Sequence, residues 1–279
     1  MTIRIVTDSS CDLPSGLIEQ YGISVLPCYV VVDDQTFKDG LEIQADDFYR
    51  RLLADGRTPT TAQPTPSDFQ TVYRELVGQG DQIISIHVSS KLSGTLNSAQ
   101  QAKASLDDGS AVEIIDSQLA SIPLGLAVLD AAIMASKGGS VYDIAGRVRQ
   151  SLGLHHGLFA LDTLEYLQKG GRIGKAQAFV GSILNVKPIL GLEDGAVLPI
   201  ERARNLQRGL RRLLELAHQE APLTRLAVIH STDPLMARGL RQELSDLLPE
   251  DQIISARFGA TLGTYIGPGG LGVALIRAG

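Results

Sequence analysis

The sequence predicts an α/β protein with two lobes, an N-terminal lobe built on a mainly parallel βαβ sheet and a C-terminal lobe with a mixed, partly antiparallel α/β sheet. The chain has 279 residues, which is near the length at which one hydrophobic core usually divides into two. In its first half, short β-branched runs alternate with helical patterns, as is typical of parallel βαβ units. In its second half, two short strand patterns flank Glu193-Asp194-Gly195, so a hairpin with antiparallel pairing is expected there.

Strands of the first half are predicted where β-branched residues cluster, at residues 3–6, 23–32, 83–88 and 112–115. A helix is predicted to follow Ser67 as its cap, because apolar residues recur at helical spacing from Phe69 to Val77. Residues 118–137 have the pattern of one long, mostly apolar helix, and residues 140–152 have the pattern of another.

The boundary between the lobes is placed near Gly153–Gly157, which gives an N-terminal lobe of residues 1–155 and a C-terminal lobe of residues 156–279. The second lobe is expected to contain strands at residues 157–161, 186–190, 197–200, 225–230, 252–257 and 273–276, and helices at residues 204–219 and 234–248. Asp233 should cap the second of these helices, because a proline follows it at the first helical position.

Composition limits the function classes that the chain can serve. Hydrophobic residues make up 44% of it, enough for a packed interior, and its net charge of -6 gives no electrostatic footprint for nucleic acid. Cys11 and Cys28 are the only cysteines and lack metal-ligand or redox spacing, so we expect no disulfide, no metal site and a reducing compartment. No apolar run reaches membrane-spanning length and a strand pattern begins almost at once, so a cytoplasmic chain without an integral membrane segment is expected.

The run Ser89–Thr95 is a candidate anion site. It follows a predicted strand and precedes a helix that carries Leu96 and Ala99. A helix N-terminus presents unpaired N–H groups and partial positive charge, and clustered hydroxyls add donors for a carboxylate or a phosphate. The alternative is that Ser93 only caps its helix.

Two further loops carry hydroxyl or carboxyl groups. Thr60–Pro66 should be irregular because its prolines disfavour regular pairing; it either supplies hydroxyl donors or is a plain linker. Asp8–Leu13 follows the first strand, where open α/β sheets place ligand-contacting loops. Asp8 would orient a partner hydroxyl or bind a metal, or else the run simply caps the next helix.

Two basic segments and one glycine-rich segment have ordinary alternatives. Gly170–Lys175 joins two helical patterns and sets Arg172 and Lys175 beside flexible backbone, as a contact for an acidic group or partner or as a solvated turn. Arg202 begins a basic run, which is usually a solvated helix face. Gly267–Gly272 has the spacing of a dinucleotide fingerprint, but a strand pattern follows where a helix is required, so a close-packed turn is predicted instead.

No established catalytic motif supplies a nucleotide, hydrolase or metal site. The sequence contains no phosphate loop, no nucleophile elbow and no metalloprotease helix, and its five histidines show no metal-ligand spacing.

Five of these segments, taken in order, closely resemble the DegV family, and the likeness extends over nearly the whole chain. They are Asp8-Ser9-Ser10-Cys11-Asp12-Leu13, Thr61-Ala62-Gln63-Pro64, Ser89 to Thr95, Asp162 to Ile173 and Gly267-Pro268-Gly269, with Asp116-Ser117 and Asn185-Val186-Lys187-Pro188 between them.

The resemblance implies a two-lobed protein that buries one long-chain fatty acid and is not an enzyme by itself. Such proteins serve as the binding subunit of bacterial fatty acid kinase, in which a separate ATP-dependent kinase subunit phosphorylates the held carboxyl group. The acyl phosphate then feeds phospholipid synthesis. No cofactor is implied for the binding subunit, and its contact with a membrane surface would be transient.

Carried over by position, the resemblance places Thr61 and Ser93 on the carboxylate. The further ligand-binding positions that it implies are Ala62, Gly94, Thr95, Tyr265 and Gly267. The positions that it implies near the head group or the partner are Arg172, Arg202, Asp8 and Ser9.

Two positions depart from the family pattern. Ala62 stands where the family usually has serine, and Tyr265 stands where it usually has histidine. A phenol can donate a hydrogen bond to a carboxyl oxygen, but it cannot supply the positive charge of a histidine. Binding is therefore less affected than phosphoryl transfer.

The residues alone leave two other functions open. A hydrolase or transferase would act through Asp8, Ser9 or Ser93 in the cleft between the lobes, although no general base is visible beside them. A lipid sensor would regulate a partner without chemistry.

Overall fold

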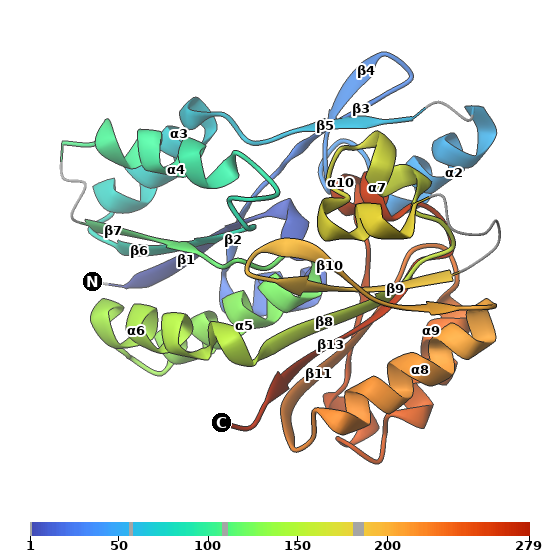
Figure 1. Ribbon diagram of the computed structural model, residues 1–279. Helices are drawn as coiled ribbons and strands as arrows, with labels where there is room; N and C mark the ends of the chain where they lie inside the picture. The colour runs from blue at the N-terminus through green and yellow to red at the C-terminus, as the bar shows by residue number, and fades with distance from the viewer. Residues whose placement is uncertain (1, 56–57, 108–110, 181–186) are drawn as a thin grey trace.

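A computed structural model describes residues 2–55, 58–107, 111–180 and 187–279 of the protein (Figure 1). The described residues form a four-stranded, a six-stranded and a three-stranded sheet, with helices between and around them. The predicted α/β class is confirmed, with a parallel sheet in the N-terminal part and a mixed sheet in the C-terminal part. The division at residues 155 and 156 remains a prediction.

The four-stranded sheet is parallel throughout, in the order β2-β1-β6-β7. Its strands are β1 (Ile3–Asp8), β2 (Ser24–Leu26), β6 (Gln82–His87) and β7 (Val112–Asp116). The helices around it are α1 (Ser15–Tyr21), α3 (Pro66–Gly78), α4 (Thr95–Ala104), α5 (Ile122–Ser136) and α6 (Val141–Ser151). Helices α3 and α4 cover one face, and α5 and α6 cover the other (Figure 1).

Proline divides the predicted strand of residues 23–32. Its first part is β2, and its second part, β3 (Tyr29–Val32), belongs to the three-stranded sheet, which is antiparallel and has the order β4-β3-β5. The other strands of that sheet are β4 (Gln35–Lys38) and β5 (Thr60–Ala62). Pro27 has no N–H for a ladder, and the next N–H, of Cys28, donates to Ser9 Oγ instead. The expectation that Thr60–Pro66 is wholly irregular was also wrong.

Helix α3 is capped by Thr65 and not by Ser67 as predicted. Thr65 Oγ1 accepts a hydrogen bond from Asp68 N, and Asp68 Oδ2 accepts one from Thr65 N at 2.7 Å. This reciprocal pair is a capping box, and Pro66 occupies the first helical position, where its missing N–H costs nothing.

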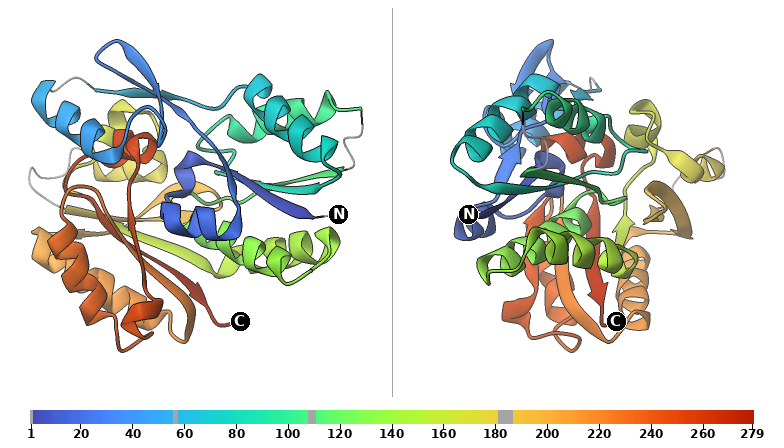
Figure 2. Two further views of the ribbon diagram at one scale, coloured as in Figure 1. Left: turned by 180° about the vertical axis from the view of Figure 1, so that it is seen from behind. Right: turned by 90° about the vertical axis from the view of Figure 1, so that its left-hand side faces the viewer.

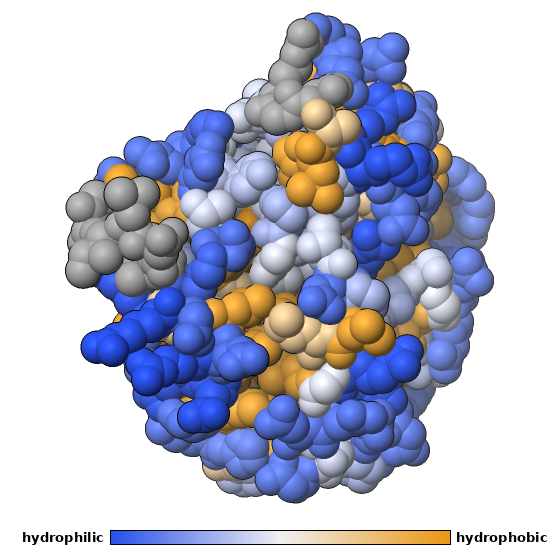
Figure 3. All heavy atoms as spheres, turned by 90° about the vertical axis from the view of Figure 1, so that its right-hand side faces the viewer, coloured by the Kyte–Doolittle hydropathy of each residue, from blue (hydrophilic) through white to orange (hydrophobic). Residues whose placement is uncertain are grey.

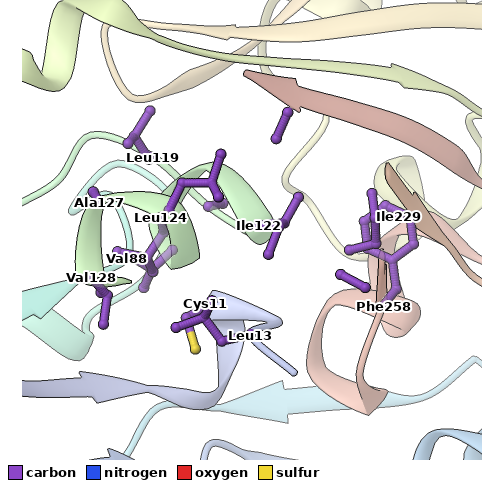
Figure 4. Packing of buried hydrophobic residues seen from close by; sticks show 14 of the residues in the cluster. Cys11, Leu13, Val88, Leu119, Ile122, Leu124, Ala127, Val128, Ile229 and Phe258 are labelled. Atoms are coloured by element: carbon purple, nitrogen blue, oxygen red, sulfur yellow. The ribbon is translucent and has the colours of Figure 1, made fainter. Parts of the chain in front are cut away.

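Helix α5 is apolar on every side because it lies between the two main sheets. It contacts β1 of the parallel sheet and β8, β11 and β13 of the six-stranded sheet. The views from behind and from the side show it in this middle layer (Figure 2), and Figure 4 shows Cys11 and Leu13 beside its side chains Ile122 and Leu124. It begins at Ile122 and not at residue 118, because the preceding turn contains positive φ angles at Gln118 and Ser121.

The six-stranded sheet has the order β10-β9-β8-β13-β11-β12, and its one parallel pair is β11 with β12. Its strands are β8 (His155–Ala160), β9 (Lys187–Glu193), β10 (Ala196–Ala203), β11 (Leu223–His230), β12 (Ile254–Arg257) and β13 (Leu271–Arg277). The predicted hairpin is confirmed: Glu193 pairs with Ala196, and Asp194 and Gly195 have the positive φ angles, 49° and 78°, of a type I′ turn. Val186, predicted in β9, lies outside the described residues.

Helices α8 (Leu206–Gln219) and α9 (Pro234–Glu243) pack on the outer side of this sheet. Asp233 caps α9 as predicted, by accepting a hydrogen bond from Met236 N, but the helix ends at Glu243 and not at residue 248. The space-filling view shows apolar side chains gathered in a hollow in the lower half of this face, where α8 and α9 lie (Figure 3). Leu235 of α9 is 73% exposed.

Two helices were not predicted: α2 (Ala45–Asp55) and α10 (Ala260–Ile266). Helix α7 (Glu165–Lys169) matches the helical pattern expected before Gly170. Helix α10 follows β12 of the six-stranded sheet in sequence, yet it packs against α2, β3 and β5 from the N-terminal part as well as against α7. It therefore joins the two parts of the chain. In the ranges that the structure describes, no helix combines the length and apolar character needed to cross a bilayer.

Candidate functional site

A narrow apolar channel lies where the parallel sheet meets the six-stranded sheet. Every strand of a parallel sheet ends at the same edge, and residues that follow all four strands line the channel: Ser10, Cys28, Leu92 and Ala120. This is the edge at which open α/β sheets bind their ligands. The opposite wall includes Phe159 of β8, Leu190 and Leu192 of β9 and Val197 of β10.

The volume of the channel suits an unbranched chain. The space between its lining atoms amounts to about 910 Å³, part of it open to solvent. Most of its lining side chains are aliphatic or aromatic, with Val88, Leu167, Phe258 and Ile266 among them, and the hydroxyls of Ser10, Ser121 and Thr261 interrupt this apolar surface. A polymethylene chain would fill such a space and remove its own surface from water.

Thr61 and Tyr265 meet at one end of the channel although 204 residues separate them. Thr61 Oγ1 lies 2.5 Å from the Tyr265 hydroxyl oxygen, so one of the two donates to the other. Pairing of β5 with β3 fixes Thr61 opposite Val30, and α10 carries Tyr265 to it. Two hydroxyl groups are thus held at a common point, with one proton free for a ligand.

The loop after β6 brings Ser93 to the same end. Ser93 Oγ lies 2.9 Å from Thr95 Oγ1 and accepts a hydrogen bond of 3.3 Å from Thr95 N. The N-cap of α4 is Gly94, which has no side chain to cap the helix. Its α-carbon faces Gln63, and a Cβ there would lie 2.8 Å from Gln63 Nε2. The capping alternative for Ser93 therefore holds only in part. Its hydroxyl oxygen accepts a hydrogen bond from the first helical N–H, of Thr95, and Ser93 also lines the channel.

Arg172 supplies a positive charge beside these hydroxyls. Its Nε donates to Leu92 O at 3.1 Å and its guanidinium carbon lies 5.3 Å from the centre of the Tyr265 ring. Gly170 permits this stacking, since a Cβ there would lie 2.5 Å from the same ring. Arg172 lines the channel, as Ala62 and Gln63 do, and all three are exposed at its mouth.

The other predicted positions do not line the channel. Arg202 lies over the Phe179 ring, 4.2 Å from its centre, and donates to Ala178 O, so it is not brought to the hydroxyl cluster. Thr95 is fully buried below Ser93. Gly267 ends α10 with φ 71°, and a Cβ there would lie 2.2 Å from the Tyr166 ring, so it serves close packing as predicted for this turn.

Asp8 lies in a buried network and not at the channel surface. It accepts hydrogen bonds from the Ser10 hydroxyl and Val88 N, and its Oδ2 lies 2.9 Å from His87 Nδ1. The chain of contacts continues from His87 Nε2 to Ser85 and then to Tyr73. Burial by itself would raise the pKa of Asp8, but its contacts with His87, Ser10 and Val88 N hold that pKa below its ordinary value. The expected contact of Asp8 with a head group is therefore not made in this geometry.

A second, open cavity lies beside the N-cap of α10, Gly259, and Ser9 lines it together with Asp12 and Asp39. Burial raises the pKa of Asp12 to about 8, although hydrogen bonds from Ser121 and Gly259 N oppose that rise. Burial likewise raises the pKa of Asp39. In the part of the chain that the structure describes, no three acidic, histidine or cysteine side chains gather closely enough to hold a metal ion.

Comparison with known proteins identifies the family. The model of the family described as an uncharacterised protein, DegV family, matches residues 2–278. The chain belongs to the DegV family. The DegV protein of Bacillus subtilis is 35% identical over 278 residues, which cover 98% of each chain.

Solved structures of DegV proteins share the fold. A DegV family protein from Thermus thermophilus, described by its fatty acid binding, covers 100% of both chains with a TM-score of 0.92 and 34% identity. A stearic acid-binding protein from Eubacterium ventriosum covers 99% of this chain and 98% of its own with a TM-score of 0.91 and 25% identity. The recognition of the DegV family from ordered loop motifs is thus confirmed.

Several residues of the site were missed by sequence reasoning. Gln63 belongs to a motif that was recognised, and its amide could have been assigned to the mouth from that motif alone. Phe159, Leu190 and Val197 carried no signal of their own, because alternating apolar residues look the same on a closed core and on a channel wall.

Proposed function

We propose that this DegV protein binds one long-chain fatty acid, with its acyl chain in the channel and its carboxylate at Thr61, Ser93 and Tyr265. The observation that carries the proposal is the joining of a narrow apolar channel to a single cluster of hydroxyls with Arg172 beside it. The names of the Thermus thermophilus and Eubacterium ventriosum proteins, which state fatty acid or stearic acid binding, support it.

The energetics favour retention by the chain and orientation by the head group. Burial of about 15 methylenes at about 0.8 kcal/mol each would supply roughly 12 kcal/mol of gross driving force. Desolvation of a carboxylate opposes this by several kcal/mol, and two or three hydrogen bonds at about 1.5 to 3 kcal/mol each offset much of that loss. Arg172 adds a charge that needs no proton from solution.

The proposal includes presentation of the bound carboxyl group to a separate ATP-dependent kinase subunit. In its support, the hydroxyl cluster lies at the mouth, where Ala62, Gln63 and Arg172 are exposed, and not at a closed end. A partner could approach the carboxyl group there while the acyl chain stays buried. Tyr265 would leave charge compensation at this point to Arg172 or to the partner.

Substitution of Ser93 by alanine tests the head-group assignment. We expect the affinity for a long-chain fatty acid to fall about tenfold, since one hydrogen bond to a charged group is lost. Ser90→Ala is the matched control, because Ser90 belongs to the same loop as Ser93 but does not line the channel. Its hydroxyl donates to Asp116 at the end of β7. Titration of each variant, with native mass spectrometry of the ligand released from wild type, makes the comparison. Equal affinities of the Ser93→Ala variant and wild type would contradict the assignment.

A stand-alone hydrolase predicts a different result from the same proteins. Its nucleophile would need a general base, whereas the Ser93 hydroxyl contacts Thr95 Oγ1 and Thr95 N. Steady turnover of an acyl or phosphate ester by the pure protein, lost in the Ser93→Ala variant, would favour the hydrolase over the carrier. Formation of acyl phosphate only after a kinase subunit and ATP are added would support the presentation of the carboxyl group.

A further inference from the structure

Neighbouring residues of three segments, here called the wall, separate the apolar channel from the open polar cavity beside the N-cap of α10, here called the polar cleft. Ser9 lines the cleft while Ser10 lines the channel, and Pro27 lines the cleft while Cys28 lines the channel. On the third side, Phe258 lines the channel and Gly259 the cleft. Neighbouring residues of three separate segments thus face opposite cavities.

Two buried carboxyl groups join these segments. Asp39 Oδ1 accepts a hydrogen bond from Ala260 N at 3.0 Å, and its Oδ2 accepts from Thr261 N at 3.2 Å and from Ser9 Oγ at 3.0 Å. Ser9 Oγ in turn accepts from Cys28 N at 3.0 Å. One side chain therefore ties the loop after β1, the loop after β2 and the start of α10 together.

Asp12 closes the same joint from the other side. Its Oδ1 accepts from Gly259 N at 2.9 Å and its Oδ2 from the Ser121 hydroxyl at 2.6 Å. Gly259 fits between the two carboxyl groups, since a Cβ there would lie 3.3 Å from Asp39 and 3.4 Å from Asp12. Asp12 and Asp39 are 8% and 5% exposed, so little water reaches the joint.

Helix α10 depends on this joint for its position over the channel. Four of its seven residues line the channel: Thr261, Leu262, Tyr265 and Ile266. The sequence of α10 favours a helix weakly, because its seven residues include two threonines, an isoleucine and a glycine. The helix is held in place by tertiary contacts, of which Asp39 makes two at its first turn.

We propose that Asp39, assisted by Asp12, is a positioning residue that holds the wall between the channel and the cleft closed and so sets the rate at which a bound acyl chain is lost. The part that concerns the ligand rests on the proposed fatty acid binding. Without Asp39, three donors lose their acceptor, the first turn of α10 is released, and the far side of the channel opens to the water of the cleft.

The two native cysteines can report on the wall, so no cysteine has to be introduced for labelling. Cys28 lines the channel and is 4% exposed, while Cys11 lines the cleft and is 1% exposed. Burial raises the pKa of both thiols, so a thiol reagent should modify each slowly in the closed protein. Opening of the wall exposes Cys28 from the channel side, and Cys11 gives the labelling rate of a thiol that already borders the cleft.

The test compares wild type with Asp39→Ala, Asp39→Asn and Asp81→Ala. Asp81 is the matched control: it is 7% exposed and accepts hydrogen bonds from Thr2 N and Arg4 Nε, away from both cavities. For each folded variant, labelling of Cys28 and Cys11 by a maleimide is followed by peptide mass spectrometry. The dissociation rate of a fluorescent long-chain fatty acid is measured in parallel.

We expect Asp39→Ala to raise the labelling rate of Cys28 and the dissociation rate of the fatty acid about tenfold each, since buried donors lose their acceptor. Asp39→Asn, which keeps one acceptor oxygen, should give intermediate rates. The labelling rate of Cys28 should rise relative to that of Cys11, and Asp81→Ala should leave the labelling rate of Cys28 and the dissociation rate unchanged even if it lowers stability.

Unchanged rates in Asp39→Ala, or equal increases in Asp39→Ala and Asp81→Ala, would overturn the proposal. Failure of wild type to take up any fatty acid would instead refute the proposed function. The labelling rates of the ligand-free proteins would still decide whether Asp39 holds the wall.

Discussion

The channel and the polar cleft use the same segments of backbone to make opposite environments. The space between the lining atoms is about 910 Å³ in the channel and about 1610 Å³ in the cleft, and part of each is open to solvent. The channel is lined mainly by apolar side chains, whereas ionisable groups such as Asp12, Asp46 and Arg257 line the cleft. Since the backbone is shared, the side chains at neighbouring positions, and not a difference in fold, make one cavity apolar and the other polar.

The largest expected effect comes from filling one cavity and leaving the other. Ala120→Phe should place a ring in the channel and weaken fatty acid binding by about 100-fold, or about 3 kcal/mol. The ring would take up space that the acyl chain needs, and it would also overpack the side chains around it. Ala45→Phe, which adds the same ring to the cleft, should leave the affinity unchanged. Titration with one fatty acid compares the two variants. Equal losses in both would break the distinction between the cavities.

A smaller effect should follow at the mouth. Tyr265→Phe removes the hydroxyl that meets Thr61 while the ring that stacks on Arg172 remains, so affinity should fall about tenfold. Restoring a polar group by Tyr265→His should recover binding below a pH of about 6.5, where imidazole gains a proton and a positive charge. Affinity measured from pH 5.5 to 8 checks both variants. A Tyr265→Phe variant that binds as wild type does would remove Tyr265 from the site.

The smallest expected effect is the change in the free energy of unfolding per pH unit that the carboxyl groups on the cleft side cause. The pKa of Asp12 is raised to about 8 in the folded protein, so the folded state holds a proton that the unfolded chain releases near pH 4. Its contribution to stability is present at low pH and is lost as the pH rises toward 8, by at most about 1.4 kcal/mol per pH unit.

Urea unfolding at pH 5, 6.5 and 8 measures this slope. Asp12→Asn cannot titrate and should give a flatter profile; the share of Asp39, whose pKa burial also raises, should persist. An unchanged slope in the Asp12→Asn variant would show that other groups control the pH dependence.

Local signals explain which elements could be predicted. The alternation of strands and helices, the hairpin at Glu193–Gly195 and the Asp233 cap each depend on a few neighbouring residues, and each is confirmed. Helix α10 and strand β5 could not be predicted because distant partners create them: α10 through Asp39, α2 and α7, and β5 through pairing with β3.

The same contrast holds for the site. The hydroxyls of Thr61 and Ser93 were found because ordered motifs mark their loops, and the structure brings them together with Tyr265 and Arg172. Asp39 was overlooked, since a single aspartate after a short strand carries no pattern that distinguishes it from a solvated turn residue. Its partners lie more than 200 positions away in the sequence, at Ala260 and Thr261.

The position of α5 in the middle layer determines how the molecule can be divided. A fragment that ends at residue 155 would contain the whole of α5 but none of the strands β8, β11 and β13 that cover its second face. A large apolar surface of that fragment would meet water and favour self-association. The two halves of this chain are therefore suited to complementation on mixing, and neither is suited to independent production.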